Sequence, residues 1–204
     1  MEGRTKLTSI SANSVKELRE KTGAGMMDCK KALEKTDGDM QKAVDYLREQ
    51  GITKAAKRAD KVAKEGIVYS YIHPGSKLGA LIEINCETDF VARTADFEQL
   101  AKDIAMQVAA TNPLAVNRTD LRQDVVEHEK EIYRNQARNE GKPEKIIDKI
   151  VEGKLEKYFQ EVCLAEQPYI KDQDRTVKDR ISESIAKIGE NITIKRFVRF
   201  RLGE

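Results

Sequence analysis

The feature that most constrains the fold of this chain is a change in the spacing of its hydrophobic residues. Over residues 66–86, apolar residues alternate with polar ones, as in strands that bury one face, and the turn sequence HPGSK divides this stretch in two. Before and after it, apolar residues recur every three or four positions, which is typical of amphipathic helices. Runs of helices beside a small antiparallel sheet predict an α+β fold.

The N-terminal part of the chain, residues 1–51, is predicted to fold as a compact module of three helices. Its expected N-cap and turn residues are, in order, Asn13 or Ser14, Gly23 with Gly25, and Asp37 with Gly38. Gly51 is expected to end the third helix. Residues 52–65 contain Ala and Lys without a broad apolar stripe, so we expect a solvated helix or a linker there.

Residues 66–204 are predicted to form a second, core domain. It would contain hairpin strands over 66–86, helices over 95–188 that include a long helical hairpin over 120–162, and a final strand over 191–202. The apolar residues of the final strand are expected to share one face, opposite a basic face; they are Ile192, Ile194, Val198, Phe200 and Leu202. This strand would complete a three-stranded antiparallel sheet packed with helices.

The charge balance and hydropathy of the chain argue against membrane and nucleic-acid partners. The chain has 37 basic and 35 acidic residues, and a formal net charge of +2 gives no general attraction to nucleic acid or to an anionic membrane. It has no run of about 18 apolar residues that could span a bilayer. The segment MEGRTKLTSISA also lacks the apolar region of a secretory signal, so we expect a cytoplasmic protein.

The residues that most often carry catalysis or bind metal show no useful pattern. Cys29, Cys86 and Cys163 are far apart, and they form no metal-binding spacing with His73 and His128. We therefore expect buried or half-buried thiols in a reducing compartment. Neither histidine has a carboxylate, cysteine or serine at a recognisable spacing, so we predict no catalytic residue, no metal site and no cofactor.

Two motifs leave structural and binding interpretations open. In TGAGMM, the adjacent Met26 and Met27 cannot both point into one small core, so one of them is expected at the surface, where Met is an adaptable contact residue. In TDFVAR, Phe90 follows a strand directly and either turns into the core or is presented as an exposed anchor. The basic face of the final strand could suit single-stranded nucleic acid, but a solvated or self-associating face explains it equally well.

Three longer stretches carry a resemblance that covers about residues 11–203. They are VKELREKTGAGMMDCKKALEKTDGDMQKAVDYLREQG, EINCETDFVAR and EQPYIKD. Together and in this order they closely resemble bacterial elongation factor Ts, in its short form. The resemblance implies a guanine nucleotide exchange factor, which catalyses no chemical reaction. It would bind elongation factor Tu with GDP, disturb the Mg²⁺ and phosphate site and promote GDP release, so that GTP can bind.

The resemblance also implies which residues contact elongation factor Tu. The N-terminal module would be a domain of the ubiquitin-associated type, and Phe90 would wedge between two helices of the partner's GTPase domain. The positions carried over are Arg19, Met26, Met27 and Lys30 in the module, Arg58 in the linker, and Thr88, Asp89, Phe90, Val91 and Arg93 in the core.

Short members of this family imply a homodimer that forms through the core sheet and acts as a two-plus-two complex. Val198 stands where a linking thiol might otherwise be, so the predicted dimer is non-covalent. One alternative function is a ubiquitin-associated-type adaptor without exchange activity, which would have no need of TDFVAR. Another is a nucleic-acid binder, which the near-neutral charge argues against.

Overall fold

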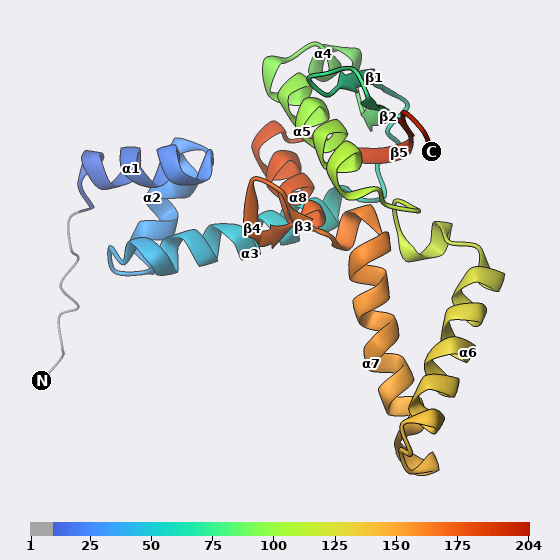
Figure 1. Cartoon of the computed structure of the whole chain (residues 1–204). Coiled ribbons are helices and arrows are strands. Elements are labelled where there is room, and N and C mark those ends of the chain that lie inside the picture. Colours follow the sequence, from blue (N-terminus) through green and yellow to red (C-terminus); the bar gives the residue numbers. More distant parts are fainter. Residues whose placement is uncertain (1–9) are drawn as a thin grey trace, which may run out of the picture.

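The computed structural model describes residues 10–204 and shows a three-helix module, a sheet-containing core and a helical hairpin that projects from the core (Figure 1). The α+β prediction is confirmed, since within these residues eight α-helices accompany a three-stranded antiparallel sheet and a two-stranded one. The prediction that the N-terminal segment lacks a secretory signal rests largely on residues 1–9, which lie outside the described residues.

The predicted three-helix module is present and has its own small core. Its helices are α1 (Ala12–Thr22), α2 (Met26–Lys35) and α3 (Met40–Arg58), around a buried cluster of Val15, Leu18, Cys29, Ala32, Leu33 and Ala43. The predicted N-cap of α1 is wrong, because Ser11 caps it and accepts a hydrogen bond from the Ser14 amide at 3.0 Å. This earlier start places Ile10 beside the cap, where it packs against the module core.

The predicted end of the third helix at Gly51 is also wrong, because α3 continues for 19 residues to Arg58. Gly51 is buried where α3 crosses α8 (Val177–Ile188), and a side chain there would begin 3.7 Å from the Cβ of Ala186. The glycine thus permits close helix packing instead of ending the helix. The helix carries the chain from the module to the core, and the proposed division at 51 and 65 stays a prediction.

The core is a three-stranded sheet covered on one face by helices. Strands β1 (Glu65–Ile72), β2 (Leu78–Cys86) and β5 (Thr193–Arg201) pair antiparallel in the order β1-β2-β5. The predicted helix after the hairpin is confirmed as α5 (Ala95–Thr111), with Thr94 as its N-cap. The apolar stripe of α5 is fully buried: Phe97, Leu100, Ile104 and Val108.

The final strand does not have the single apolar face that its sequence predicts. Glu83 pairs with Arg196 while the next residue of β2, Ile84, pairs with Ile194, so Lys195 is an extra residue in a β-bulge. The bulge reverses the direction of the side chains beyond it. Ile194 is buried, but Val198 and Phe200 are 42% and 74% exposed on the opposite face. The prediction is therefore wrong beyond residue 195.

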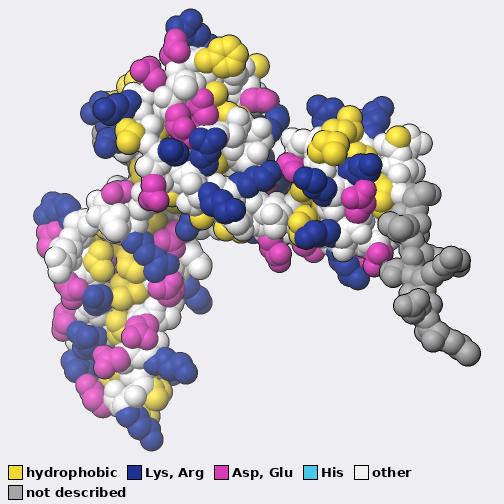
Figure 2. Space-filling view, turned by 180° about the vertical axis from the view of Figure 1, so that it is seen from behind, with side chains coloured by type: hydrophobic (Ala, Val, Ile, Leu, Met, Phe, Trp, Pro, Cys, Tyr) yellow, Lys and Arg dark blue, Asp and Glu magenta, His cyan; other side chains and the backbone are white. Residues whose placement is uncertain are grey.

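The predicted helical hairpin is confirmed as α6 (Gln123–Asn139) and α7 (Glu144–Val162), which project from the core. It has a separate apolar cluster of Ala137, Ile147, Val151 and Leu155. Hydrophobic side chains also reach the surface along it (Figure 2). The remaining elements are α4 (Asp89–Ala92), η1 (Arg118–Asp120), η2 (Leu164–Glu166) and the paired strands β3 (Pro168–Tyr169) and β4 (Asp172–Thr176). The β3–β4 pair was not predicted.

Candidate functional site

The Phe90 turn, which we define as residues 88–93, lies directly after β2 and presents an aromatic ring to solvent. Thr88 is the N-cap of the single-turn helix α4, and its hydroxyl accepts from the Val91 amide at 3.4 Å. Phe90 is 78% exposed, whereas Val91 and Ala92 are buried in the main core. The structure thus favours the exposed alternative for Phe90. It also places Val91, a predicted contact residue, inside the turn and not on its surface.

Two charged residues lie on the exposed side of the Phe90 turn. The Arg93 guanidinium lies 2.7 Å from the carboxylate of Asp89, and both side chains are mostly exposed. An exposed pair of this kind contributes about 0–1 kcal/mol, because water screens it. Both charges therefore remain free to exchange this contact for one with a partner protein beside Phe90.

The methionine pair, Met26 and Met27, forms a second exposed apolar surface at the start of α2. Sequence reasoning expects at least one of them at the surface, and the structure exposes both, at 51% and 63%. The turn before α2 ends α1 at Gly23, whose φ of 68° is left-handed and suits glycine. Unbranched, polarizable Met side chains adapt to the shape of a partner.

The remaining predicted contact residues fall into two places. Arg19 on α1 and Lys30 on α2 are exposed on the same module as the methionine pair, and Lys30 lies 3.8 Å from Glu34. Arg58, at the end of α3, instead lies beside the Phe90 turn. Its Nη1 donates to both carboxylate oxygens of Glu87, at 3.3 and 3.2 Å. The structure therefore assigns Arg58 an internal contact in addition to any contact with a partner.

Sequence reasoning missed a carboxylate that holds the Phe90 turn. Glu190 follows the end of α8 and accepts hydrogen bonds from the amides of Glu87 and Thr88 and from the Thr88 hydroxyl. Its neighbour Asn191 donates its amide to Glu87 at 2.6 Å. No local pattern could reveal these contacts, because the two segments lie about a hundred residues apart and meet only when β5 joins the sheet.

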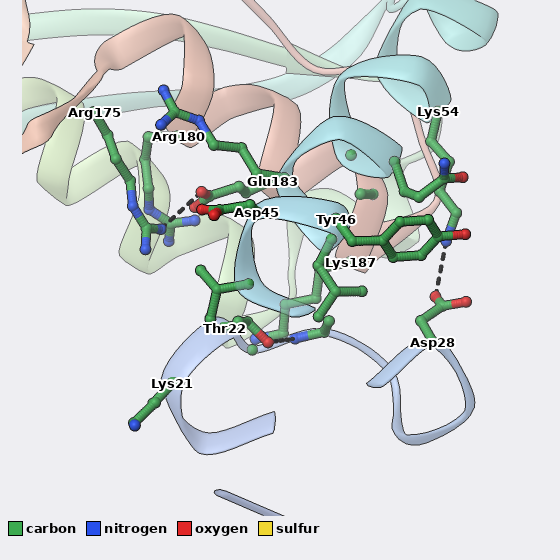
Figure 3. Close-up of a pocket in the computed structure, with 18 of the residues that line it drawn as sticks. Lys21, Thr22, Asp28, Asp45, Tyr46, Lys54, Arg175, Arg180, Glu183 and Lys187 are labelled. Carbon is green, nitrogen blue, oxygen red and sulfur yellow. Dashed lines mark hydrogen bonds and ion pairs between the residues drawn. The ribbon is translucent and has the colours of Figure 1, made fainter. Parts of the chain in front are cut away.

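A groove of about 850 Å³ separates the three-helix module from the core, and sequence reasoning missed it as well (Figure 3). Several of the charged side chains that line it form ion pairs with one another. Lys54 lies 2.8 Å from Asp28, and Arg175 lies 2.7 Å from Glu183. Burial raises the pKa of Glu183 in spite of the nearby arginines. Basic and acidic side chains both line the groove, and the basic ones outnumber the acidic ones.

The three cysteines are buried, as predicted. Burial raises the pKa of the Cys86 and Cys163 thiols to about 11, so these thiols are protonated at neutral pH. Within residues 10–204, no cluster of three His, Cys, Asp or Glu side chains is arranged to hold a metal ion. Over the same residues, no helix is both long and apolar enough to cross a membrane.

Known proteins resemble this chain over almost its whole length. Residues 5–204 match the family model described as elongation factor TS. The elongation factor Ts of Heliobacterium modesticaldum is 63% identical over 195 residues, which are 96% of this chain and 91% of the relative. That of Desulforamulus reducens is 61% identical over 198 residues (97% and 91%), and that of Moorella thermoacetica is 61% identical over 195 residues (96% of both).

Proposed function

This chain belongs to the elongation factor Ts family, and we propose that it drives GDP from elongation factor Tu with two surfaces, the methionine pair and the Phe90 turn. Family membership makes it a guanine nucleotide exchange factor that allows GTP to replace GDP. The proposal concerns how the residues of this chain perform that exchange. It also holds that the exchange makes and breaks only non-covalent contacts, so that the protein catalyses no chemical reaction.

The observation that carries the proposal is the exposure of Phe90 on an anchored turn. Its ring is 78% exposed, while the next two residues are buried. Burying such a ring in a pocket of elongation factor Tu would contribute about 1.5–3 kcal/mol. We infer that Phe90 wedges between two helices of the partner near the site that holds Mg²⁺ and the phosphates of GDP. Asp89 and Arg93 would supply polar contacts around the ring.

The energetics of exchange explain why a second surface is needed. An exchange factor must bind the nucleotide-free partner more tightly than the GDP-bound one, and GDP must weaken its binding by the same ratio. A 10⁴-fold ratio needs about 5.5 kcal/mol of differential contact, which is more than one aromatic ring supplies. The methionine pair, with Arg19 and Lys30 on the same module, would supply the remainder from the three-helix module.

We further infer that the protein forms a non-covalent homodimer through the outer sheet face, giving a two-plus-two complex. This face, opposite α5, is defined by exposed apolar residues of all its strands: Val68, Ile72, Leu81, Val198 and Phe200. The register places Leu81 opposite Val198, and Phe200 opposite Gly79. An exposed apolar face of this kind favours self-association. The cysteines are buried, so a disulfide would not link the copies.

The structure gives little support to a nucleic-acid partner. The bulge at Lys195 divides the basic residues of β5 between its two faces. Arg199 turns inward, where it donates to the Ala109 carbonyl, and Arg196 pairs with Glu83 at 2.7 Å. Basic and acidic side chains are also interspersed over the face shown in Figure 2. We therefore propose a cytoplasmic protein partner, elongation factor Tu, and no direct nucleic-acid contact.

The test is the release of a fluorescent GDP analogue from elongation factor Tu, followed by stopped flow with and without this protein. We expect the release rate to rise with the concentration of the factor. Changing both Met26 and Met27 to Ala should reduce how steeply the release rate rises with the concentration of the factor. The module should stay folded, because both side chains are exposed. An unaccelerated release would refute the proposed function, and an unimpaired double variant would refute the role of the methionine pair.

A further inference from the structure

The direction in which Phe90 points is set by its surroundings and not by the ring itself. Phe90 is 78% exposed, so its own packing does little to hold it. Helix α4 has only four residues, and one helical turn is unstable without support. Burial of Val91 and Ala92 fixes the side of the turn that faces the core. The start of the turn, at Thr88, must be fixed by something else.

The carboxylate of Glu190 fixes that start through three hydrogen bonds. Its Oε1 accepts from the Thr88 hydroxyl at 2.6 Å. Its Oε2 accepts from the Thr88 amide at 3.0 Å and from the Glu87 amide at 3.1 Å. Hydrogen bonds to an ionised acceptor are stronger than those between neutral groups. Because the Thr88 hydroxyl donates its hydrogen bond to Glu190, its lone pairs are available to accept one from the Val91 amide.

Glu190 is itself held in place by the local backbone and by a reciprocal contact. Gly189 ends α8 in the left-handed conformation, with φ 87°, and turns the chain toward the end of β2. The Asn191 amide then donates to Glu87 at 2.6 Å, and the Asn191 side chain donates to the Lys61 carbonyl at 2.7 Å. Each of the two segments thus donates backbone hydrogen bonds to a carboxylate of the other. The Asn191 side chain also links them to the chain just beyond α3.

We infer that Glu190 is a positioning residue for nucleotide exchange, which holds the Phe90 turn in the orientation that meets elongation factor Tu. This inference rests on the proposed function of Phe90. Glu190 acts through Thr88 and need not touch the partner. If the turn samples other orientations, only a fraction of the molecules can bind productively, and the apparent affinity falls by that fraction.

The test variant is Glu190→Gln, which keeps the shape of the side chain and removes its charge. The Gln side chain has one acceptor oxygen where Glu190 has two. Its NH₂ group would therefore face a Glu87 or Thr88 group that now donates to the carboxylate. We expect kcat/KM for GDP release to fall about tenfold, the size of effect that follows from losing hydrogen bonds to a charged group. Glu152→Gln, which neutralises an exposed carboxylate on the projecting helix α7, is the matched control and should not change the rate.

A double-mutant cycle with Phe90→Ala separates positioning from a general structural role. If Glu190 acts through Phe90, Glu190→Gln should change the rate less than about twofold in the Phe90→Ala background. Amide hydrogen exchange gives a second readout, in which the Glu87 and Thr88 amides should exchange faster in Glu190→Gln while those of β2 keep their protection. A general loss of stability would speed exchange in both places.

The outcomes of this cycle are distinct. An unchanged rate in Glu190→Gln, or an equal loss in both backgrounds, would overturn the positioning role while leaving the proposed function intact. Faster exchange of the β2 amides would also overturn it, because the effect would then be one of stability. If Phe90→Ala alone releases GDP as fast as the parent, the proposed function of Phe90 fails first, and the positioning role fails with it.

Discussion

The guanidinium of Arg58 and the carboxylate of Glu87 form an ion pair with a closest distance of 3.2 Å. The pair joins the last residue of α3 to the residue just before the Phe90 turn. Helix α3 has 19 residues, which corresponds to a length of about 28 Å, and its first part packs on the module that carries the methionine pair. The two proposed contact surfaces are therefore connected by one continuous helix with a charged link at its end.

Neutralising Glu87 should slow GDP release less than removing the Arg58 side chain does. Glu87→Gln removes the charge but keeps an acceptor for the Asn191 amide, and the Arg58 side chain is 42% exposed, so we expect less than about 1 kcal/mol lost from the free energy of unfolding. Arg58→Ala should slow GDP release further, because Arg58 is also a predicted contact with elongation factor Tu. Urea unfolding and stopped-flow release measure the two effects. Equal slowing by both variants would argue against a direct Arg58 contact.

Phe90→Ala should slow exchange while leaving the fold intact. Losing a ring that the partner buries should reduce kcat/KM about ten- to a hundredfold. The melting temperature should hardly change, because the ring is mostly exposed in the free protein. Leu114→Ala is a suitable control, since Leu114 is also exposed but follows the opposite end of α5. Slowing of the same size in Leu114→Ala would show that the effect is not specific to Phe90.

A charge in the outer sheet face should separate the proposed dimer. Phe200→Glu places a carboxylate in the apolar face, where a second copy would leave it without water or a partner. Light scattering of the parent should give twice the 23.1 kDa mass of the chain, and that of the variant should give the chain mass. Ile146→Glu, on the helical hairpin, should not change the mass. A parent that scatters as 23.1 kDa would refute the dimer.

The buried thiols predict how reactivity and stability change with pH. Because the pKa of Cys86 and Cys163 is raised from 9.0 to about 11, their thiolate fraction at pH 8 is about a hundredfold below that of free thiols. The unfolded chain loses these protons first, so the free energy of unfolding should fall as the pH rises from 9 toward 11. A thiol reagent at pH 8 should modify the native protein slowly and the urea-unfolded chain quickly. Rapid labelling of the native chain would contradict this.

The parts of the fold that follow from local patterns could be predicted from the sequence. The strand pair before Cys86, the capped helix that begins after Thr94 and the helical hairpin each depend on spacing and end residues close together in the chain. Gly51 shows the limit of such reasoning, because a glycine near the end of a helical pattern suits both a helix end and a close helix crossing. The partner helix α8, more than a hundred residues later, decides between them.

The sequence proposes several residues for the candidate site but does not predict their arrangement. The sequence indicates that Phe90 follows a strand in a polar break, yet it leaves the ring between core and surface. Burial of Val91 and Ala92 settles this, and burial depends on how α4 sits on the sheet. The contacts of Glu190 with the Phe90 turn depend on chain segments that β5 brings together, so they cannot be predicted from a local sequence pattern.

The bulge at Lys195 means that a single residue of chain length decides which side of the last strand is interior. If β5 ran through Lys195 without the bulge, the side chains beyond residue 195 that now face the core would change places with those of the outer face. Phe197 would then turn out to solvent and Phe200 would press against the main core, with no change in any residue. In this strand, the number of residues between two paired positions, and not their hydrophobicity, decides which side chains lie inside the protein.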